Sequence, residues 1–181
     1  FAEESTDGAF LLRARREGLR DFGACMSPHT AWLMLQGLET LPLRMARHVE
    51  NTRKVVAFLA AHPMVADVGY PELDDHPSHV LAQRLLPRGC GAVFSFDLKG
   101  SRAMGVAFIE ALKIFSHLAN VGDARSLVIH PASTTHFRME DAALAQAGIG
   151  PGTIRLSVGL EDPDDLIDDL KRALKAAEKA A

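Results

Sequence analysis

The sequence is poor in aromatic residues and has no excess of basic residues. Aromatic side chains make up 6% of its 181 residues, and 20 lysines and arginines are outnumbered by 23 aspartates and glutamates, which gives a formal net charge of -3. Surfaces that bind nucleic acids are usually basic, and those that bind single strands add aromatic rings that stack on the bases. We therefore expect no nucleic-acid partner.

Cysteines and long apolar runs are also scarce. No apolar run approaches the roughly 18 residues that a membrane-spanning helix needs, and no signal-like segment opens the chain. The two cysteines, Cys25 and Cys90, are too few for a disulfide framework and form no Cys-x-x-Cys motif. We expect two reduced structural thiols in a protein of the cytoplasm, with no membrane partner.

The residues that are present suffice for one hydrophobic core. Hydrophobic residues make up 48% of the chain, enough for a single buried core or for one domain with an appended element. The chain begins with Phe1 and has no initiator methionine. We interpret it as a piece of a longer protein.

Two helices are predicted in the first third of the chain. Ser27-Pro28 is a typical helix start, because the serine oxygen can cap free amides and a proline at the first helical position lacks only a donor that would be unpaired anyway. We predict helices over residues 28–40 and 42–61, the second ended by His62-Pro63. One face of the second helix is formed by Met45, Val49, Thr52, Val56 and Leu59.

These segments differ in their expected surroundings. The helix over 28–40 is apolar around most of its circumference and should be buried on more than one side, although no partner for its second face is obvious. At about 1.5 Å per residue, the helix over 42–61 is about 30 Å long and can bridge two domains. The charged stretch 13–17 is either a short helix or a solvated linker.

The remainder of the chain reads as a compact α/β unit. Strands are predicted over 65–70, 92–98, 114–118, 126–130 and 153–158, with helices over 78–86, 101–112, 139–147 and 162–180. The strand over 92–98 alternates apolar and polar residues, which indicates one buried face. Because helices do not separate every pair of strands, we predict an α/β (α+β sandwich) fold with a mixed or largely antiparallel sheet.

Several kinds of site lack their motifs. The chain has no Gly-x-Ser-x-Gly elbow, no Walker loop and no Gly-x-Gly-x-x-Gly sequence. The glycine-rich stretch 148–152 precedes a strand, whereas phosphate loops precede a helix, so we interpret it as a turn. His76 and His79 are the closest histidine pair, but a proline separates them and no further ligands cluster nearby, so no metal is expected.

Polar residues gather where two predicted strands begin or end. The stretch 117–136 runs from a Gly-Asp turn through a short apolar strand into a loop of hydroxyls and imidazoles. It is either a simple polar turn or one wall of a binding site. Arg155 shares the polar face of its strand with Thr153 and Ser157, and is either a surface arginine or a bidentate ligand for a carboxylate. If the two strands are neighbours, Ser126 and Arg155 can converge on one carboxylate.

Six segments of this chain carry a resemblance: Ser27-Pro28 and residues 35–40, 47–51, 117–127, 130–136 and 154–162. In order and with matching spacing, they resemble the C-terminal part of O-acetylhomoserine sulfhydrylases. These enzymes belong to the cystathionine γ-synthase group of pyridoxal-phosphate enzymes, and the resemblance runs from about residue 18 to the end. The amino-acid sequence of residues 120–127 resembles that of sulfhydrylases more than that of the related synthases and lyases.

The resemblance implies roles for individual residues. Arg155 falls on the family's arginine for the substrate α-carboxylate, Ser126 and Leu127 on the residues that line the substrate pocket beside it, and Thr135 with His136 on a pair behind that pocket. The implied reaction loses acetate from O-acetylhomoserine and adds sulfide, giving homocysteine. Whether the ester is acetyl or succinyl, and whether sulfide or a thiol is the second substrate, stays open.

The family's cofactor lysine lies in a Ser-x-Thr-Lys-type segment, and this sequence has none. The resemblance therefore implies that residues 1–62 are the linker and interdomain helices, and residues 63–181 the small C-terminal domain, of a fold-type I enzyme that forms a homotetramer. The catalytic and cofactor-binding residues would lie in a missing large domain, so we expect no activity and no covalent pyridoxal phosphate here. The alternative is a non-catalytic module that binds an amino acid or a partner helix.

Overall fold

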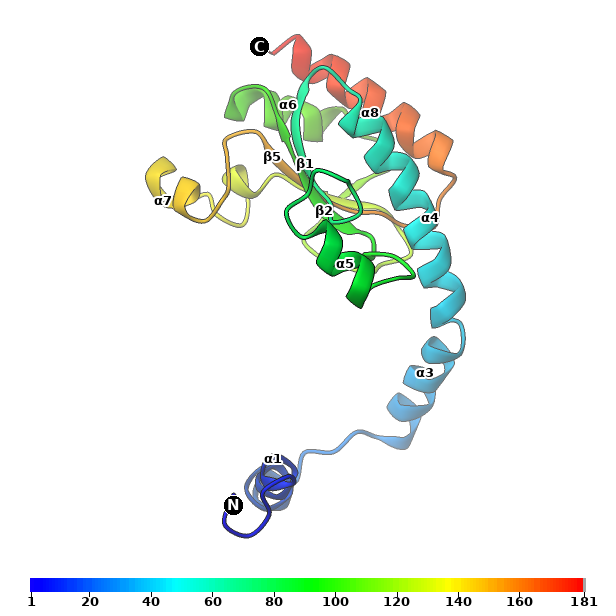
Figure 1. Cartoon of the computed structure of the whole chain (residues 1–181), viewed down its shortest axis with the longest axis vertical. Helices are drawn as coiled ribbons and strands as arrows, with labels where there is room; N and C mark the ends of the chain where they lie inside the picture. Colours follow the sequence, from blue (N-terminus) through cyan, green and yellow to red (C-terminus); the bar gives the residue numbers. More distant parts are fainter. Residues whose placement is uncertain (181) are drawn as a thin grey trace. The chain divides into compact units, whose positions relative to one another are not determined.

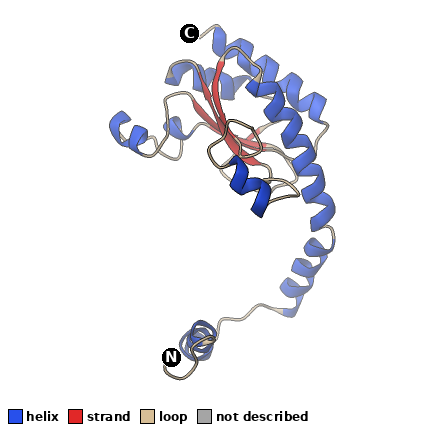
Figure 2. Ribbon diagram, viewed as in Figure 1, coloured by secondary structure: helices blue, strands red, loops and turns tan. Residues whose placement is uncertain are grey.

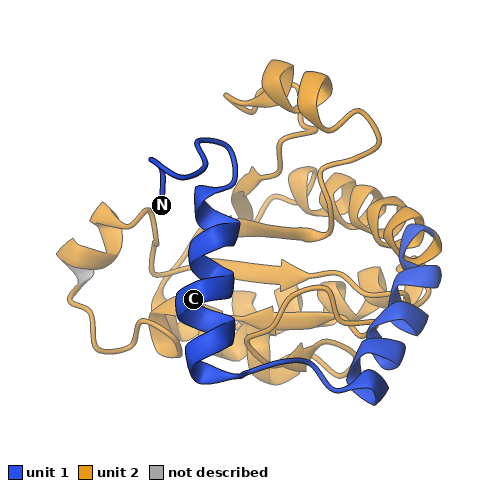
Figure 3. Ribbon diagram, turned by 90° about the horizontal axis from the view of Figure 1, so that it is seen from below, with its two compact units in different colours: residues 1–42 blue, residues 43–181 orange. Residues whose placement is uncertain are grey.

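The structure, a computed structural model, describes residues 1–180 apart from the side chain at position 141. Contacts within the chain divide it into two compact units, Phe1–Pro42 and Leu43–Ala181, coloured separately in Figure 3. The predicted boundary after residue 62 concerns the domains of a longer enzyme and stays a prediction.

The first unit is helical. A continuous helical stretch consists of α1 (Ala9–Arg13), the π-helical turn η1 (Ala14–Leu19) and α2 (Arg20–Phe22), so the charged stretch 13–17 is helix rather than linker. It ends at Gly23, whose φ of 69° favours glycine. Helix α3 (Pro28–Glu39) begins as predicted, because the Ser27 side chain accepts a hydrogen bond from the N–H of Thr30 at 3.1 Å.

The expectation that this helix is buried on more than one side is wrong for this chain. Helix α3 buries none of its residues, and Trp32 and Leu35 are 54% and 59% exposed. A helix buries apolar side chains only against a second layer of structure. The described part of the first unit supplies no such layer around α3.

The second unit is built on a five-stranded mixed sheet (Figure 2), which confirms the predicted fold class. The spatial order is β1-β2-β5-β4-β3, with antiparallel pairs except for the parallel pair β4 and β3. The strands are β1 (Val65–Gly69), β2 (Val93–Leu98), β3 (Ser116–His117), β4 (Leu127–Ile129) and β5 (Thr153–Ser157). Strand β5 is therefore central, with β2 and β4 on its two sides.

Three helices form a layer on one face of this sheet (Figure 1). They are α4 (Leu41–Ala60), α6 (Arg102–Ala111) and α8 (Pro163–Glu178). The shorter helices are α5 (His79–Leu85), the 3-10 turn η2 (Pro131–Ser133) and α7 (Asp141–Gln146). No helix within residues 1–180 is both long enough and apolar enough to span a membrane.

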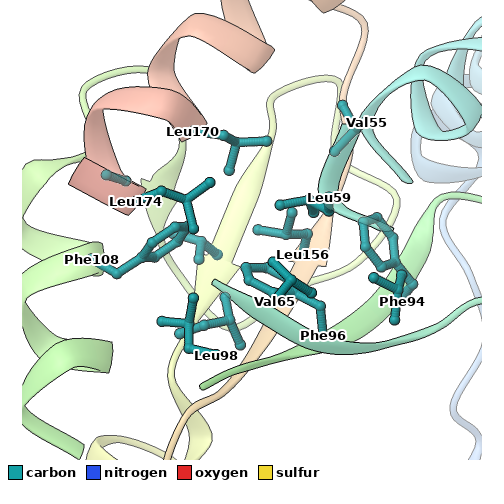
Figure 4. Close-up of a cluster of buried hydrophobic side chains, with 14 of the residues drawn as sticks. Val55, Leu59, Val65, Phe94, Phe96, Leu98, Phe108, Leu156, Leu170 and Leu174 are labelled. Carbon is teal, nitrogen blue, oxygen red and sulfur yellow. The ribbon is translucent and has the colours of Figure 1, made fainter. Parts of the chain in front are cut away.

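The core lies between the sheet and this helical layer. Figure 4 shows Phe94 and Phe96 of β2 and Leu156 of β5 packed against Leu59 of α4 and Leu170 of α8. The period-two pattern predicted for β2 and β5 is confirmed, since their alternate apolar residues point into this core. Arg155, one residue before Leu156, therefore stands on the opposite face of the sheet, away from the helices.

The predicted apolar face of α4 is correct over most of its length. Val49, Thr52, Val56 and Leu59 are buried, but Met45 is 37% exposed and was wrongly included. The first turns of α4 precede the part that packs on the sheet, and its first buried residue is His48.

Candidate functional site

Arg155 occupies the middle of the central strand. Its neighbours across the sheet are Ser95 on β2 and Ile129 on β4. The side chain is half-buried, and its Nη2 donates a hydrogen bond of 3.5 Å to the carbonyl oxygen of Asn120. Within residues 1–180 it forms no ion pair with a carboxylate. A half-buried guanidinium without an acidic partner is suited to bind a carboxylate through its planar fork.

Leu127 lies on the face of Arg155, but the Ser126 hydroxyl does not. Leu127 pairs with Ser157 across β4 and β5, so its side chain shares the face of Ser157 and Arg155. The fully buried Ser126 instead donates through its hydroxyl to Glu161 Oε2 at 2.8 Å. The expected convergence of the Ser126 and Arg155 side chains is wrong, because successive side chains of an extended segment point to opposite faces.

A turn covers the outer face of β5 beside Arg155. Asn120 supplies the carbonyl that accepts from Arg155, and the N–H of Gly122 donates to Ser157 Oγ at 3.3 Å. Gly122 has a φ of 73°, a conformation that side chains with a Cβ rarely adopt. The sequence predicted a Gly-Asp turn here, and the structure adds that it packs on the strand that carries Arg155.

Thr135 lies in the loop after η2. Its side chain is exposed, and its hydroxyl lies 2.8 Å from His136 Nδ1. No hydrogen bond between described residues joins this pair to Arg155 or Leu127. The structure therefore pairs Thr135 with His136, and their role in substrate binding stays a prediction.

The buried His130 anchors the same loop, a role that sequence reasoning missed. His130 Nε2 lies 2.8 Å from the carbonyl oxygen of Pro151, and Nδ1 lies 2.8 Å from Ser133 Oγ. A carbonyl only accepts, so Nε2 carries the proton and Nδ1 accepts from the Ser133 hydroxyl. Burial lowers the pKa of His130, and the positive charge of Arg102 lowers it further. The ring is therefore neutral and structural.

A separate cavity of about 260 Å³ lies near α5. Glu72 borders it and accepts from Arg53 Nε at 2.6 Å and from the Cys90 N–H at 2.9 Å. Burial alone would raise the pKa of Glu72, but the hydrogen bonds from Arg53 and Cys90 outweigh burial and hold it below its usual value. Arg53 and Glu72 thus form an ion pair at the edge of this cavity.

The described residues include no cluster of three histidine, cysteine, aspartate or glutamate side chains able to hold a metal ion. His76 Nδ1 accepts a hydrogen bond from the N–H of Ser78, and His79 Nε2 lies 2.7 Å from Gln83 Nε2. Both cysteines are free.

Comparison with known proteins decides the family. Residues 6–175 match the family described as Cys/Met metabolism PLP-dependent enzyme. The chain belongs to this family. The matched range includes most of both compact units and every residue of the candidate site.

Curated proteins whose names give different activities resemble this chain. It is 50% identical over 168 residues to the O-acetyl-L-homoserine sulfhydrylase of Leptospira meyeri, covering 92% of this chain and 38% of that protein. It is 44% identical over 170 residues to the L-methionine gamma-lyase of Pseudomonas putida, covering 93% of this chain and 42% of that protein.

A solved structure gives the same fold. The crystal structure assigned as an O-acetylhomoserine (thiol)-lyase from Campylobacter jejuni, with N′-pyridoxyl-lysine-5′-monophosphate at position 205, matches with a TM-score of 0.84 and 42% identity. The match covers 92% of this chain and 40% of that chain. The chain thus spans about two fifths of the length of the relatives it matches.

The lysines of this chain do not fit the cofactor that the family name implies. A lysine that binds pyridoxal phosphate covalently needs a desolvated site that lowers its pKa. All six lysine side chains here are exposed, and Lys54 and Lys171 form surface ion pairs with Glu50 and Asp168. The six are Lys54, Lys99, Lys113, Lys171, Lys175 and Lys179.

Proposed function

We propose that this chain provides the substrate-carboxylate side of a pyridoxal-phosphate enzyme that makes homocysteine from O-acetylhomoserine and sulfide. The observation that carries the proposal is Arg155, a half-buried guanidinium in the centre of the sheet without an acidic partner among residues 1–180. The 50% identity to a sulfhydrylase supports the choice of reaction. Elimination from methionine is the second candidate, favoured by the similarity to a methionine gamma-lyase.

The proposed task of Arg155 is to orient the substrate. Two parallel N–H donors can hold the substrate α-carboxylate in one plane, while the Asn120 carbonyl restrains the guanidinium. Leu127 on the same face gives the pocket an apolar wall that excludes water beside the ion pair. Ser126 supports this wall from behind, and Thr135 is proposed to border the pocket. The cofactor, when bound, supplies an electron sink.

The remaining parts of the site are proposed to lie in the rest of the enzyme. The exposed lysines support the idea that the cofactor lysine is not in this chain. We expect that this chain alone is inactive and binds no pyridoxal phosphate covalently. Mixing the two and reducing with borohydride tests this: a stoichiometric, mass-detectable pyridoxyl adduct would contradict it. The cytoplasmic location, the boundary after residue 62 and the homotetramer belong to the same proposal, and light scattering of the complete enzyme tests the last.

The reaction is tested with the complete enzyme. We expect homocysteine to form from O-acetylhomoserine and sulfide faster than from O-succinylhomoserine, with little keto acid released from methionine. Preferential keto-acid formation from methionine would replace the sulfhydrylase with the lyase. The alternative of a non-catalytic module is tested by calorimetry of this chain with O-acetylhomoserine, since a dedicated binding module saturates whereas part of an active site binds feebly.

A further inference from the structure

Glu161 connects the two segments that carry the proposed pocket. Its Oε1 accepts from the N–H of Ser126 at 2.7 Å, and its Oε2 accepts from the Ser126 hydroxyl at 2.8 Å. Ser126 Oγ in turn accepts from the N–H of Gly159 at 2.8 Å. One carboxylate thus joins the residue before β4 to the segment that follows β5.

The segment after β5 is also fixed from the side of α4. His48 Nδ1 lies 2.7 Å from the carbonyl oxygen of Val158, so this nitrogen carries the proton. Asn51 Nδ2 donates to the carbonyl oxygens of Gly159 at 3.0 Å and Glu161 at 2.8 Å. Both side chains are buried, and two acceptors fix the orientation of the amide. The backbone that carries Glu161 therefore has little freedom to move.

The carboxylate of Glu161 forms no ion pair with any residue among 1–180. Its two oxygens instead face two donors of one residue, an N–H and a hydroxyl, in a partly buried position. Charge-assisted hydrogen bonds of this kind are shorter and stronger than neutral ones. A carboxylate used in this way fixes the position of Ser126 rather than balancing a charge.

We propose that Glu161 is a positioning residue that fixes Ser126, and through it Leu127, against β5, so that the apolar wall stays at its place beside Arg155. The proposal rests on the proposed function of Arg155. Leu127 follows Ser126 directly and begins β4, so a shift of Ser126 is passed to Leu127. Displacements of about 1 Å are enough to weaken an oriented substrate.

Glu161→Gln in the complete enzyme tests the proposal. Glutamine offers one acceptor oxygen to the two donors of Ser126, so Leu127 loses its fixed position. The buried side chains of His48 and Asn51 still hold the backbone of the segment after β5. We expect KM for the amino-acid substrate to rise about tenfold with kcat within about twofold of the unsubstituted enzyme, the pattern for lost substrate binding. Glu161→Asp keeps the charge but is shorter, and should give an intermediate KM. Glu50→Gln, an exposed glutamate of α4 paired with Arg47 and Lys54, is the matched control.

Arg155→Ala in the same assay separates the two proposals. If Arg155→Ala raises KM but Glu161→Gln behaves like Glu50→Gln, the positioning role is wrong and the proposed function stands. If neither variant changes KM, the proposed function itself fails. Both Glu161 variants could instead reduce only the amount of folded enzyme. If the folded enzyme that remains has an unchanged KM, or if no folded enzyme remains to assay, Glu161 serves folding and the positioning role is overturned.

Discussion

Leu127 stands on the same face of the sheet as Arg155, two residues along β4 from Ile129, the direct neighbour of Arg155. The buried leucine and the half-buried guanidinium are thus diagonal neighbours on one face of the sheet. The hydroxyl of the preceding residue, Ser126, turns away to Glu161 and Gly159. In the proposed function, Arg155 binds the amino-acid carboxylate and Leu127 forms the apolar wall beside it.

Replacement of Arg155 is expected to impair the complete enzyme through substrate binding. Arg155→Ala should lower kcat/KM by an amount that corresponds to about 2 to 5 kcal/mol of lost transition-state stabilisation, since a charged clamp is lost. Arg155→Lys should restore only a small part, because an ammonium lacks the two parallel donors. Steady-state kinetics measure both, with the exposed Arg84→Ala as control. A loss below about tenfold for Arg155→Ala would argue against the clamp.

Asp169 is expected to be a main source of stability. Its buried carboxylate accepts from the N–H groups of Lys113 at 2.9 Å and Ile114 at 2.8 Å, and it pairs with Arg172. Asp169→Asn turns an amide N–H₂ toward these donors and should cost about 3 kcal/mol. Urea unfolding of the chain measures this. Asp168→Asn, next in sequence but exposed, should change little.

The same carboxylate predicts that the stability of the chain decreases in acid. Burial alone would raise the pKa of Asp169. The hydrogen bonds that its carboxylate accepts from Arg172 and from the backbone N–H groups of residues 113–115 outweigh burial and hold the pKa below its usual value. Its contribution is complete above the unfolded pKa of about 4 and is lost as the pH falls through the lower folded value. In the Asp169→Asn variant, the free energy of unfolding should depend less on pH below about pH 4. An unchanged slope would contradict the assignment.

The buried His130 predicts a second change of stability with pH, at a higher pH than that of Asp169. Burial lowers its pKa in the folded chain, so below about pH 6.5 the unfolded chain binds a proton that the folded chain does not. Stability should therefore decrease as the pH falls from 6.5 toward the folded value. His130→Gln, which can still donate to Pro151, should remove this decrease in urea titrations, whereas exposed His29→Gln should retain it. Equal slopes in both variants would refute the prediction.

Gly159 is expected to tolerate no side chain. A Cβ there would lie 2.4 Å from Glu161 Oε2 and 2.5 Å from the carbonyl oxygen of Ala124. Gly159→Ala should destabilise the chain by about 1 to 3 kcal/mol, as overpacking does. Gly37→Ala in α3, where a Cβ meets nothing within 4 Å, should be neutral or stabilising. Thermal unfolding compares them, and equal melting temperatures would show that the 158–161 segment can move aside.

Local patterns were enough to predict most elements of the fold. Ser27 caps α3 as its position before a proline indicates, and Asp162 caps α8 in the same way, because capping depends on atoms only two or three residues apart. The alternation in β2 and β5 identified the face of the sheet that enters the core, which also placed Arg155 on the other face. The mixed sheet followed from strands not separated by helices.

The sequence by itself thus determined most elements, the buried faces of β2 and β5, and Arg155 as a candidate ligand, but it indicated the wrong surroundings for α3. The tertiary structure alone decided which way Ser126 points and that Glu161 holds it, since these residues are 35 positions apart. It also decided that His48 and Asn51, polar residues within an apolar pattern, are buried. Their partners lie about 110 residues away, and a periodicity within one helix carries no information on a carbonyl contributed by a distant segment.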